Sequence, residues 1–265
     1  MDLTKITVAT VGYMPADFDK RKITNWKSSI FSITGEIESY SLTKDSDGFN
    51  WEFTDSSLEE VLPKNFSGDY LIAIVNVPIE LNWYSRRLRN NRVVFTFHEI
   101  KEILRQHNIP LENIIYRILY AYTLLYKRSG NKIPTAGEHT NFAHDETRGC
   151  LFDMNGIKTD IVHSCHNPII CTNCIEKLKQ EKVSNEVISK TQKDIAKIKK
   201  PLFYQIAEFV KKHPIWSLLI SAVTAIILGA IGSYIATVIY ETGKKSGITS
   251  HWSNLLHFLN IMDRV

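Results

Sequence analysis

The sequence predicts a mixed α/β domain that carries a zinc-bound hairpin and helix, followed by a helical connector and one C-terminal transmembrane helix. Three observations predict it. Apolar β-branched runs alternate with helical patterns over residues 1–135, all four cysteines lie within residues 150–174, and residues 215–240 are apolar without one charge. A composition of 44% apolar and 23% charged residues is that of a globular protein and excludes wholesale disorder.

The α/β domain is predicted over residues 1–135. Residues 6–12 and 92–97 read as strands because β-branched residues are enriched there, and residues 68–80 read as a central buried strand because they form a continuous apolar run. The segments IFSIT and FNWEF are also strand-like. A short helix is expected in HEIKEILRQHN and a longer one after Pro110, where these apolar residues recur at helical spacing: Leu111, Ile114, Ile115, Ile118, Leu119, Tyr122 and Leu125.

Residues 136–178 contain a pattern of metal-binding residues. Cys171-x-x-Cys174 begins a predicted helix, Cys150 stands at the foot of a hairpin predicted about Asn155-Gly156, and His144 lies shortly before it. Thiolate and imidazole donors at such spacings suit a closed, tetrahedral zinc site with a structural role. The predicted ligands are His144, Cys150, Cys171 and Cys174, in a zinc-binding hairpin and helix that packs on the α/β domain.

Other ligand sets remain open at this point. Cys165, flanked by His163 and His166, is an alternative fourth ligand in place of His144, and His139 is another candidate. A redox role for the Cys-x-x-Cys pair is a third interpretation, although such pairs usually follow a strand of a thioredoxin-like unit.

The uncharged run predicts a transmembrane helix over residues 214–241, since about 20 apolar residues cross the hydrocarbon of a bilayer. Lysines are denser before the run than after it, which places the N-terminal domain in the cytoplasm and the tail, residues 242–265, outside the inner (plasma) membrane. The cytoplasm keeps thiols reduced, so disulfides are not expected. The lysines concerned are Lys197, Lys199, Lys200, Lys211, Lys212, Lys244 and Lys245.

Residues 179–213 are predicted to be a basic helical connector that bends at Pro201. A weak heptad pattern runs through it, with Ile188, Ile195, Leu202 and Phe209 in one position and Thr191, Ile198 and Gln205 in another. Because the lysine-rich segment precedes a membrane helix, anionic lipid is its expected partner and nucleic acid is not expected.

Two features of the C-terminal region predict membrane contacts. Small residues recur every four positions in the transmembrane run and favour homo-oligomers through close helix packing: Ser221, Ala225, Gly229, Ser233 and Thr237. The tail has one apolar side, consistent with a helix on the outer membrane surface: Trp252, Leu255, Leu256, Leu259 and Met262.

The cysteine pattern resembles that of archaemetzincin-like proteins, a branch of the metzincin metallopeptidases. Cys150-Leu151 is similar to their Cys-Met pair, Cys171-x-x-Cys174 to their closing pair, and His144 stands roughly in place of their first cysteine. The resemblance covers residues 1–178 and implies a metzincin-like fold with a structural zinc. It also implies that the strand at 71–77, an edge-like strand at 92–97 and the helix at 111–127 follow one another in that order.

The resemblance fails at the catalytic motif. The helix ENIIYRILYAYTLLYKRSG contains no histidine, whereas the family carries His-Glu-x-x-His there. The sequence therefore favours a non-catalytic recognition or signalling domain, a pseudo-peptidase, whose strand at 92–97 pairs with a peptide or protein ligand and whose role suits bacterial stress or anti-phage defence. The alternative is a divergent membrane-tethered metallopeptidase that uses His98, Glu99 and Glu102, the first and last of which would share one helix face.

Overall fold

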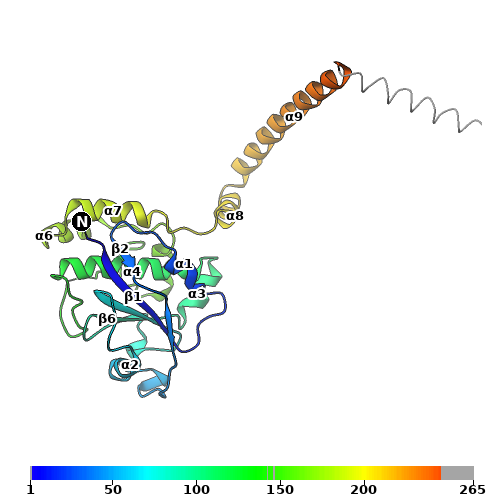
Figure 1. Ribbon diagram of the computed structural model, residues 1–265. Helices are drawn as coiled ribbons and strands as arrows, with labels where there is room; N and C mark the ends of the chain where they lie inside the picture. The colour runs from blue at the N-terminus through cyan, green and yellow to red at the C-terminus, as the bar shows by residue number, and fades with distance from the viewer. Residues whose placement is uncertain (1, 142, 146, 246–265) are drawn as a thin grey trace, which may run out of the picture. The chain divides into compact units, whose positions relative to one another are not determined.

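The computed structural model describes residues 2–141, 143–145 and 147–245 (Figure 1). The chain divides into two compact units, Met1–Pro201 and Leu202–Val265. The predicted amphipathic helix of the tail lies outside the described residues.

Unit 1 is built on a mixed sheet whose strand order is β2-β1-β4-β6-β5, with β3 also pairing with β1. All described pairs are parallel except β5–β6, which is antiparallel. The strands are β1 (Thr4–Val11), β2 (Phe31–Ile33), β3 (Glu38–Tyr40), β4 (Tyr70–Val75), β5 (Ser85–Leu88) and β6 (Arg92–Thr96).

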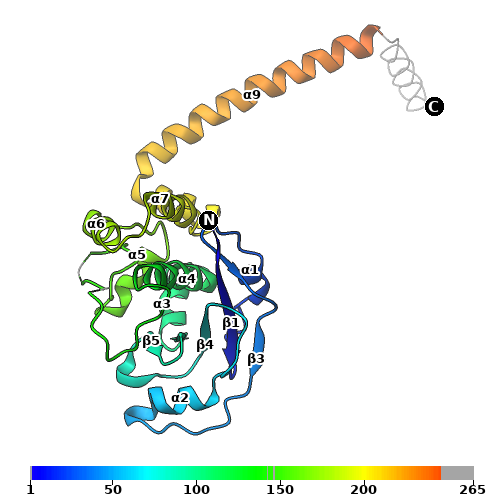
Figure 2. The same ribbon diagram turned by 60° about the vertical axis from the view of Figure 1, so that its left-hand side comes forward.

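The central strand β4 is buried along its whole length, as its continuous apolar sequence predicts. Its side chains alternate between two cores. Ile72 and Ile74 pack in the larger core on the side of α4, whereas Ala73 and Val75 pack in the smaller core on the side of α2. Figure 2 shows these two helices on opposite sides of the sheet.

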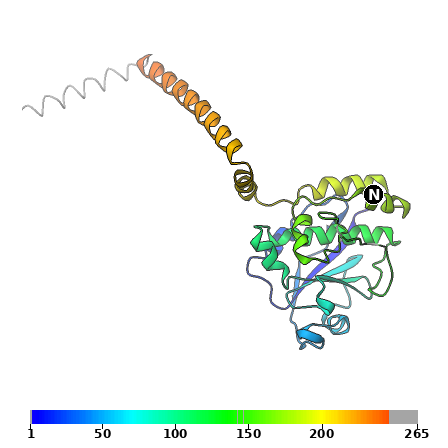
Figure 3. The same cartoon turned by 180° about the vertical axis from the view of Figure 1, so that it is seen from behind.

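Helices cover both faces of the sheet, and α4 is almost wholly buried because a further layer of helices packs over it. Figure 3 shows α7 lying along α4, and the two helices are in contact. The helices of unit 1 are α1 (Lys20–Thr24), α2 (Asp55–Val61), α3 (Ile100–Gln106), α4 (Leu111–Arg128), α5 (Ile161–Ser164), α6 (Thr172–Gln180) and α7 (Asn185–Ile195), with short 3-10 helices η1 (Phe49–Trp51), η2 (Glu80–Asn82) and η3 (Lys158–Asp160).

Two strand predictions require correction. The segment FNWEF does not form a strand, because Asn50 and Trp51 adopt left-handed backbone angles that a strand does not accommodate. It contains the short helix η1 instead. The strand predicted at 92–97 exists as β6, but it lies between β4 and β5 and is not an edge strand. The edge of the sheet is formed by β5, a polar strand that the sequence did not predict.

The hairpin predicted about Asn155-Gly156 does not form. Asn155 has a positive φ of 51°, but Gly156 does not, whereas the tight hairpin turn requires both. The Asp153 carboxylate instead accepts a hydrogen bond from the Asn155 N–H at 2.9 Å, a local Asx turn. The chain then enters η3 and α5 rather than a returning strand.

The predicted connector divides at Pro201, where unit 1 ends. Its first part forms α7, whose N-terminus is capped by the Ser184 side chain and whose Ile188, Thr191 and Ile195 are buried in unit 1. These residues of the heptad pattern therefore pack inside the domain and not against another chain.

Unit 2 contains α8 (Leu202–Lys212) and α9 (Pro214–Lys245). Among the described residues, α9 is the one helix long and apolar enough to cross a membrane, with a mean hydropathy of 2.2, and no residue of its most apolar stretch is buried. Its small residues at the predicted four-residue spacing are exposed as well.

Candidate metal centre and neighbouring pocket

The structure brings the four predicted metal donors together. Cys171 is the residue before α6, and Cys174 lies in its first turn, so the helix start presents two thiols on one side. Cys150 reaches them because the chain beside it pairs with Ile169: Leu151 N–H donates to the Ile169 carbonyl at 2.8 Å, and Ile169 N–H donates to the Gly149 carbonyl at 2.9 Å.

His144 is positioned by a second short backbone pairing. Its N–H donates to the Phe152 carbonyl at 3.0 Å, and its carbonyl accepts from Met154 N–H at 2.8 Å. The turn between Cys150 and Asp153 therefore connects both pairings and holds the imidazole over the thiols. Gly149 permits this path with a φ of 87°, which a side chain would strain.

The distances between the donor atoms fit a tetrahedral zinc ion. His144 Nε2 lies 3.3 Å from Cys150 Sγ and 3.6 Å from Cys171 Sγ, and the Sγ atoms of Cys150 and Cys174 are 3.9 Å apart. All four donors lie within 4.8 Å of one another. Zinc–sulfur bonds of about 2.3 Å at tetrahedral angles separate two sulfurs by about 3.8 Å, so the His-Cys₃ group can hold zinc with every position filled.

The thiols differ in their ionisation. A hydrogen bond with the Cys174 thiol lowers the pKa of Cys150 to about 5, which favours the thiolate that a metal requires. Cys165, by contrast, is fully buried, and that burial raises its pKa to about 12. Cys165 lies outside the group of donors that converge, as do His139 and the two histidines beside Cys165.

The three alternative catalytic residues do not form one group of donors, although His98 Nε2 lies 3.9 Å from Glu99 Oε1. His98 precedes α3, so it does not share a helix face with Glu102, and Glu99 adopts a positive φ of 62° at the helix boundary. A 2.6 Å hydrogen bond from Lys158 occupies the Glu99 carboxylate and lowers its pKa. Among the described residues, these three do not form a metal-binding group.

A cavity of about 460 Å³ lies beside the metal centre, between β5, α4 and the segments 136–141 and 151–154. Its lining includes Arg117, which is 2% exposed. Nη1 of this arginine donates to the Tyr84 hydroxyl at 3.2 Å, and Nη2 donates to the Asp153 carbonyl at 2.8 Å. The guanidinium also lies over the Tyr84 ring, 5.4 Å from its centre.

Sequence reasoning did not single out this pocket. A signal existed at Arg117, a charged residue between Ile114, Ile118 and Ala121 on the buried side of an apolar helix pattern. Tyr84 and Asp153 gave no comparable signal, because their contacts with Arg117 join segments that are far apart in the chain.

No family model and no curated protein matches the chain. Among solved structures, it is similar to archaemetzincin from Methanopyrus kandleri, with 13% sequence identity and a TM-score of 0.38 over 68% of this chain and 95% of that one. The similarity to the archaemetzincin structure is therefore loose.

Proposed function

We propose that the chain is a membrane-anchored, non-catalytic recognition protein: a zinc-stabilised α/β domain that binds a ligand in the pocket beside β5. The observation that carries the proposal is the separation of metal from pocket. The four donors of the His-Cys₃ group leave zinc no open position, and a catalytic zinc needs one for water or substrate. The pocket lining instead includes arginine, tyrosine and apolar residues.

The ligand that fits this site is an extended peptide. β5 is the edge of the sheet, paired with β6 on one side, and its residues line the pocket. Because the Tyr84 carbonyl accepts from Thr96 in β6, the alternation of an antiparallel ladder directs the backbone groups of Ser85 and Arg87 toward the open side. A peptide can add there as a further strand, at β5 rather than at the 92–97 strand proposed from the sequence.

The membrane part of the proposal rests on α9, the helix whose length and hydropathy suit a bilayer. The lysine asymmetry supports a cytoplasmic domain at the inner (plasma) membrane, with anionic lipid as a partner of the basic residues and the C-terminus outside. The exposed small residues of α9 support homo-oligomers. A ligand-binding domain on a self-associating membrane helix suits signalling, and we extend the proposal to bacterial stress or anti-phage signalling.

The decisive experiment is metal analysis of the full chain in detergent, combined with an assay for cleavage of an unstructured peptide mixture. We expect one zinc per chain, retained in His98→Ala, and no cleavage. A second, chelator-labile metal that disappears in His98→Ala would contradict the proposal. So would cleavage that is lost in Glu99→Gln.

The membrane arrangement has its own test. Reporter fusions after residue 245 should be active only outside the cytoplasm, and fusions after residue 201 only inside. For self-association, Gly229→Leu should weaken a reporter of transmembrane dimers by about 1 kcal/mol, whereas Ala230→Leu, which places the same side chain beside the stripe, should not. Equal effects of the two substitutions would contradict an interface along the stripe.

A further inference from the structure

Arg117 lines the pocket, and the described residues offer it no ion pair. Among the described residues, no carboxylate forms an ion pair with Arg117, and its Nε–H is buried without an acceptor. The neighbours that favour its charge are the Tyr84 and Tyr122 phenols and the Cys165 thiol. A fully buried charge is costly unless it is paired, so a guanidinium held only by a phenol and a carbonyl indicates that a ligand supplies the anion.

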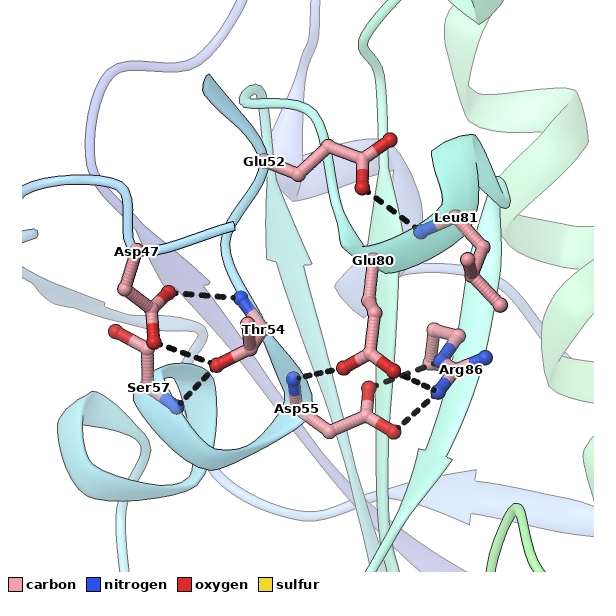
Figure 4. Close-up of polar contacts among 8 residues, drawn as sticks. All are labelled: Asp47, Glu52, Thr54, Asp55, Ser57, Glu80, Leu81 and Arg86. Atoms are coloured by element: carbon pink, nitrogen blue, oxygen red, sulfur yellow. Dashed lines mark hydrogen bonds and ion pairs between the residues drawn. The ribbon is translucent and has the colours of Figure 1, made fainter. Parts of the chain in front are cut away.

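The pocket lining contains two other arginines, Arg86 and Arg87, and carboxylates bind the first of them. Arg86 points to the opposite face of β5, where the Asp55 and Glu80 carboxylates bind its guanidinium (Figure 4). Arg87 turns toward the pocket side and donates to backbone carbonyls, those of Pro134 at 3.2 Å and Glu138 at 3.3 Å. Among the described residues, neither Arg87 nor Arg117 forms an ion pair, although the Glu138 and Asp153 carboxylates also line the cavity.

The remaining walls determine what kind of anion fits. The apolar lining includes Trp83, Ile118, Ala121, Leu151, Phe152 and Met154. A volume of about 460 Å³ is large enough for an amino-acid residue with its side chain, and the apolar part of the lining offers contacts that a bare, strongly hydrated anion would not use. The planar fork of a guanidinium binds a carboxylate through two parallel hydrogen bonds.

We propose that the pocket binds a carboxylate that carries an apolar group, with Arg117 as its principal contact and Arg87 as a second, and that the source is the C-terminal residue of a peptide. The backbone of such a peptide would add to β5 and end where α4 presents Arg117. This inference rests on the proposed recognition function and names its ligand class.

The test uses two probes that differ only in charge, N-acetyl-L-phenylalanine and N-acetyl-L-phenylalaninamide, titrated calorimetrically into the full chain in detergent at constant ionic strength. For probes of this size we expect a Kd on the order of 1 mM for the carboxylate and an affinity about 10- to 100-fold lower for the amide. Equal affinities, or no binding of either probe up to about 20 mM, would overturn the proposal.

Two further probes distinguish the sources of the anion. 3-Phenylpropionate carries the carboxylate and ring without a peptide group; if it binds more weakly than N-acetyl-L-phenylalanine, the peptide terminus is supported. If 3-phenylpropionate binds more tightly, a peptide source is overturned. Inorganic phosphate that competes as well as the carboxylate probe would overturn a carboxylate site.

Substitutions test which arginine contacts the carboxylate of the probe. Arg117→Met should abolish the preference for carboxylate over amide, and Arg87→Met should reduce it about threefold. The control is Arg89→Met, which makes the same change in net charge at an exposed residue outside the pocket and should leave the ratio unchanged. Bound zinc reports whether Arg117→Met is folded; a ratio that survives Arg117→Met overturns the assignment. One zinc and no cleavage with equal probe affinities would reject this ligand class alone, whereas cleavage or a second metal would reject the proposed function.

Discussion

The metal centre and the arginine pocket share the chain from Cys150 to Asp153. They differ in whether the protein itself supplies partners for the charged groups. At the metal centre, three thiols and one imidazole converge within 4.8 Å, so one divalent cation can be coordinated by the whole group. In the pocket, the Arg117 guanidinium donates to a phenol and a carbonyl but forms no ion pair within the described part of the chain, and it lines the cavity. We propose that the first site is completed by a zinc ion and serves stability, whereas the second binds an exchangeable ligand.

The largest effect should follow from removing a metal donor. Cys174→Ser should abolish zinc binding and lower the free energy of unfolding by more than about 4 kcal/mol, because the binding energy of a structural zinc is folding energy. Zinc content and thermal unfolding of the full chain in detergent measure this. Cys165→Ala is the matched control, since this thiol is buried outside the donor group, and it should keep zinc and cost about 1 kcal/mol. Equal losses in the two variants would show that cysteine burial, and not zinc, stabilises the domain.

Metal removal should also disable the pocket. The turn that carries Cys150 presents the Asp153 carbonyl to Arg117, so without zinc the arginine loses a fixed partner. We expect chelation to weaken carboxylate binding at least about tenfold and zinc to restore it, as is typical when groups that orient a site are lost. If the zinc-free chain binds the probe with undiminished affinity, the two regions are independent.

The sequence predicted the metal centre better than the pocket, and the reason is physical. Cys171 and Cys174 occupy one helix start, so spacing alone indicates their convergence. The predicted path of the intervening chain was wrong, since the Asp153–Asn155 turn replaces a hairpin. The donors still meet because Leu151 pairs with Ile169, a contact that depends on tertiary packing.

The same difference between local patterns and tertiary contacts explains which parts of the fold could be predicted. The buried strand β4 and the amphipathic helix α4 follow from local apolar patterns. The edge position of β5 does not, because SRRL carries neither an apolar run nor a clear alternation, and its place depends on its antiparallel pairing with β6. A pocket bounded by an edge strand therefore had no local signature.

Two buried arginines of α4 should respond differently to the same substitution. Arg128 pairs with the Glu181 carboxylate at the end of α6, so Arg128→Met should cost about 1–2 kcal/mol, a moderate amount because Glu181 is partly exposed. Arg117→Met should change stability by less than about 1 kcal/mol, because it removes an unpaired buried charge. The Asp153 carbonyl keeps its hydrogen bond from the Asn155 side chain in that variant. Unfolding midpoints measure both, and a loss at Arg117 as large as that at Arg128 would mean that the guanidinium is structural.

The smallest expected effect is that of pH on the affinity of the pocket for a carboxylate. Burial lowers the pKa of Arg87, but an arginine remains charged throughout the accessible range, and a ligand carboxylate is ionised above about pH 5. Carboxylate affinity should therefore vary by less than about twofold between pH 6 and 9 if the arginines hold the anion. His139 also lines the cavity and offers the competing explanation, since an imidazole can donate a hydrogen bond to an anion. A larger variation with pH would contradict binding by the arginines, and affinity that is lost in His139→Gln but kept in Arg117→Met would transfer the anion site from Arg117 to His139.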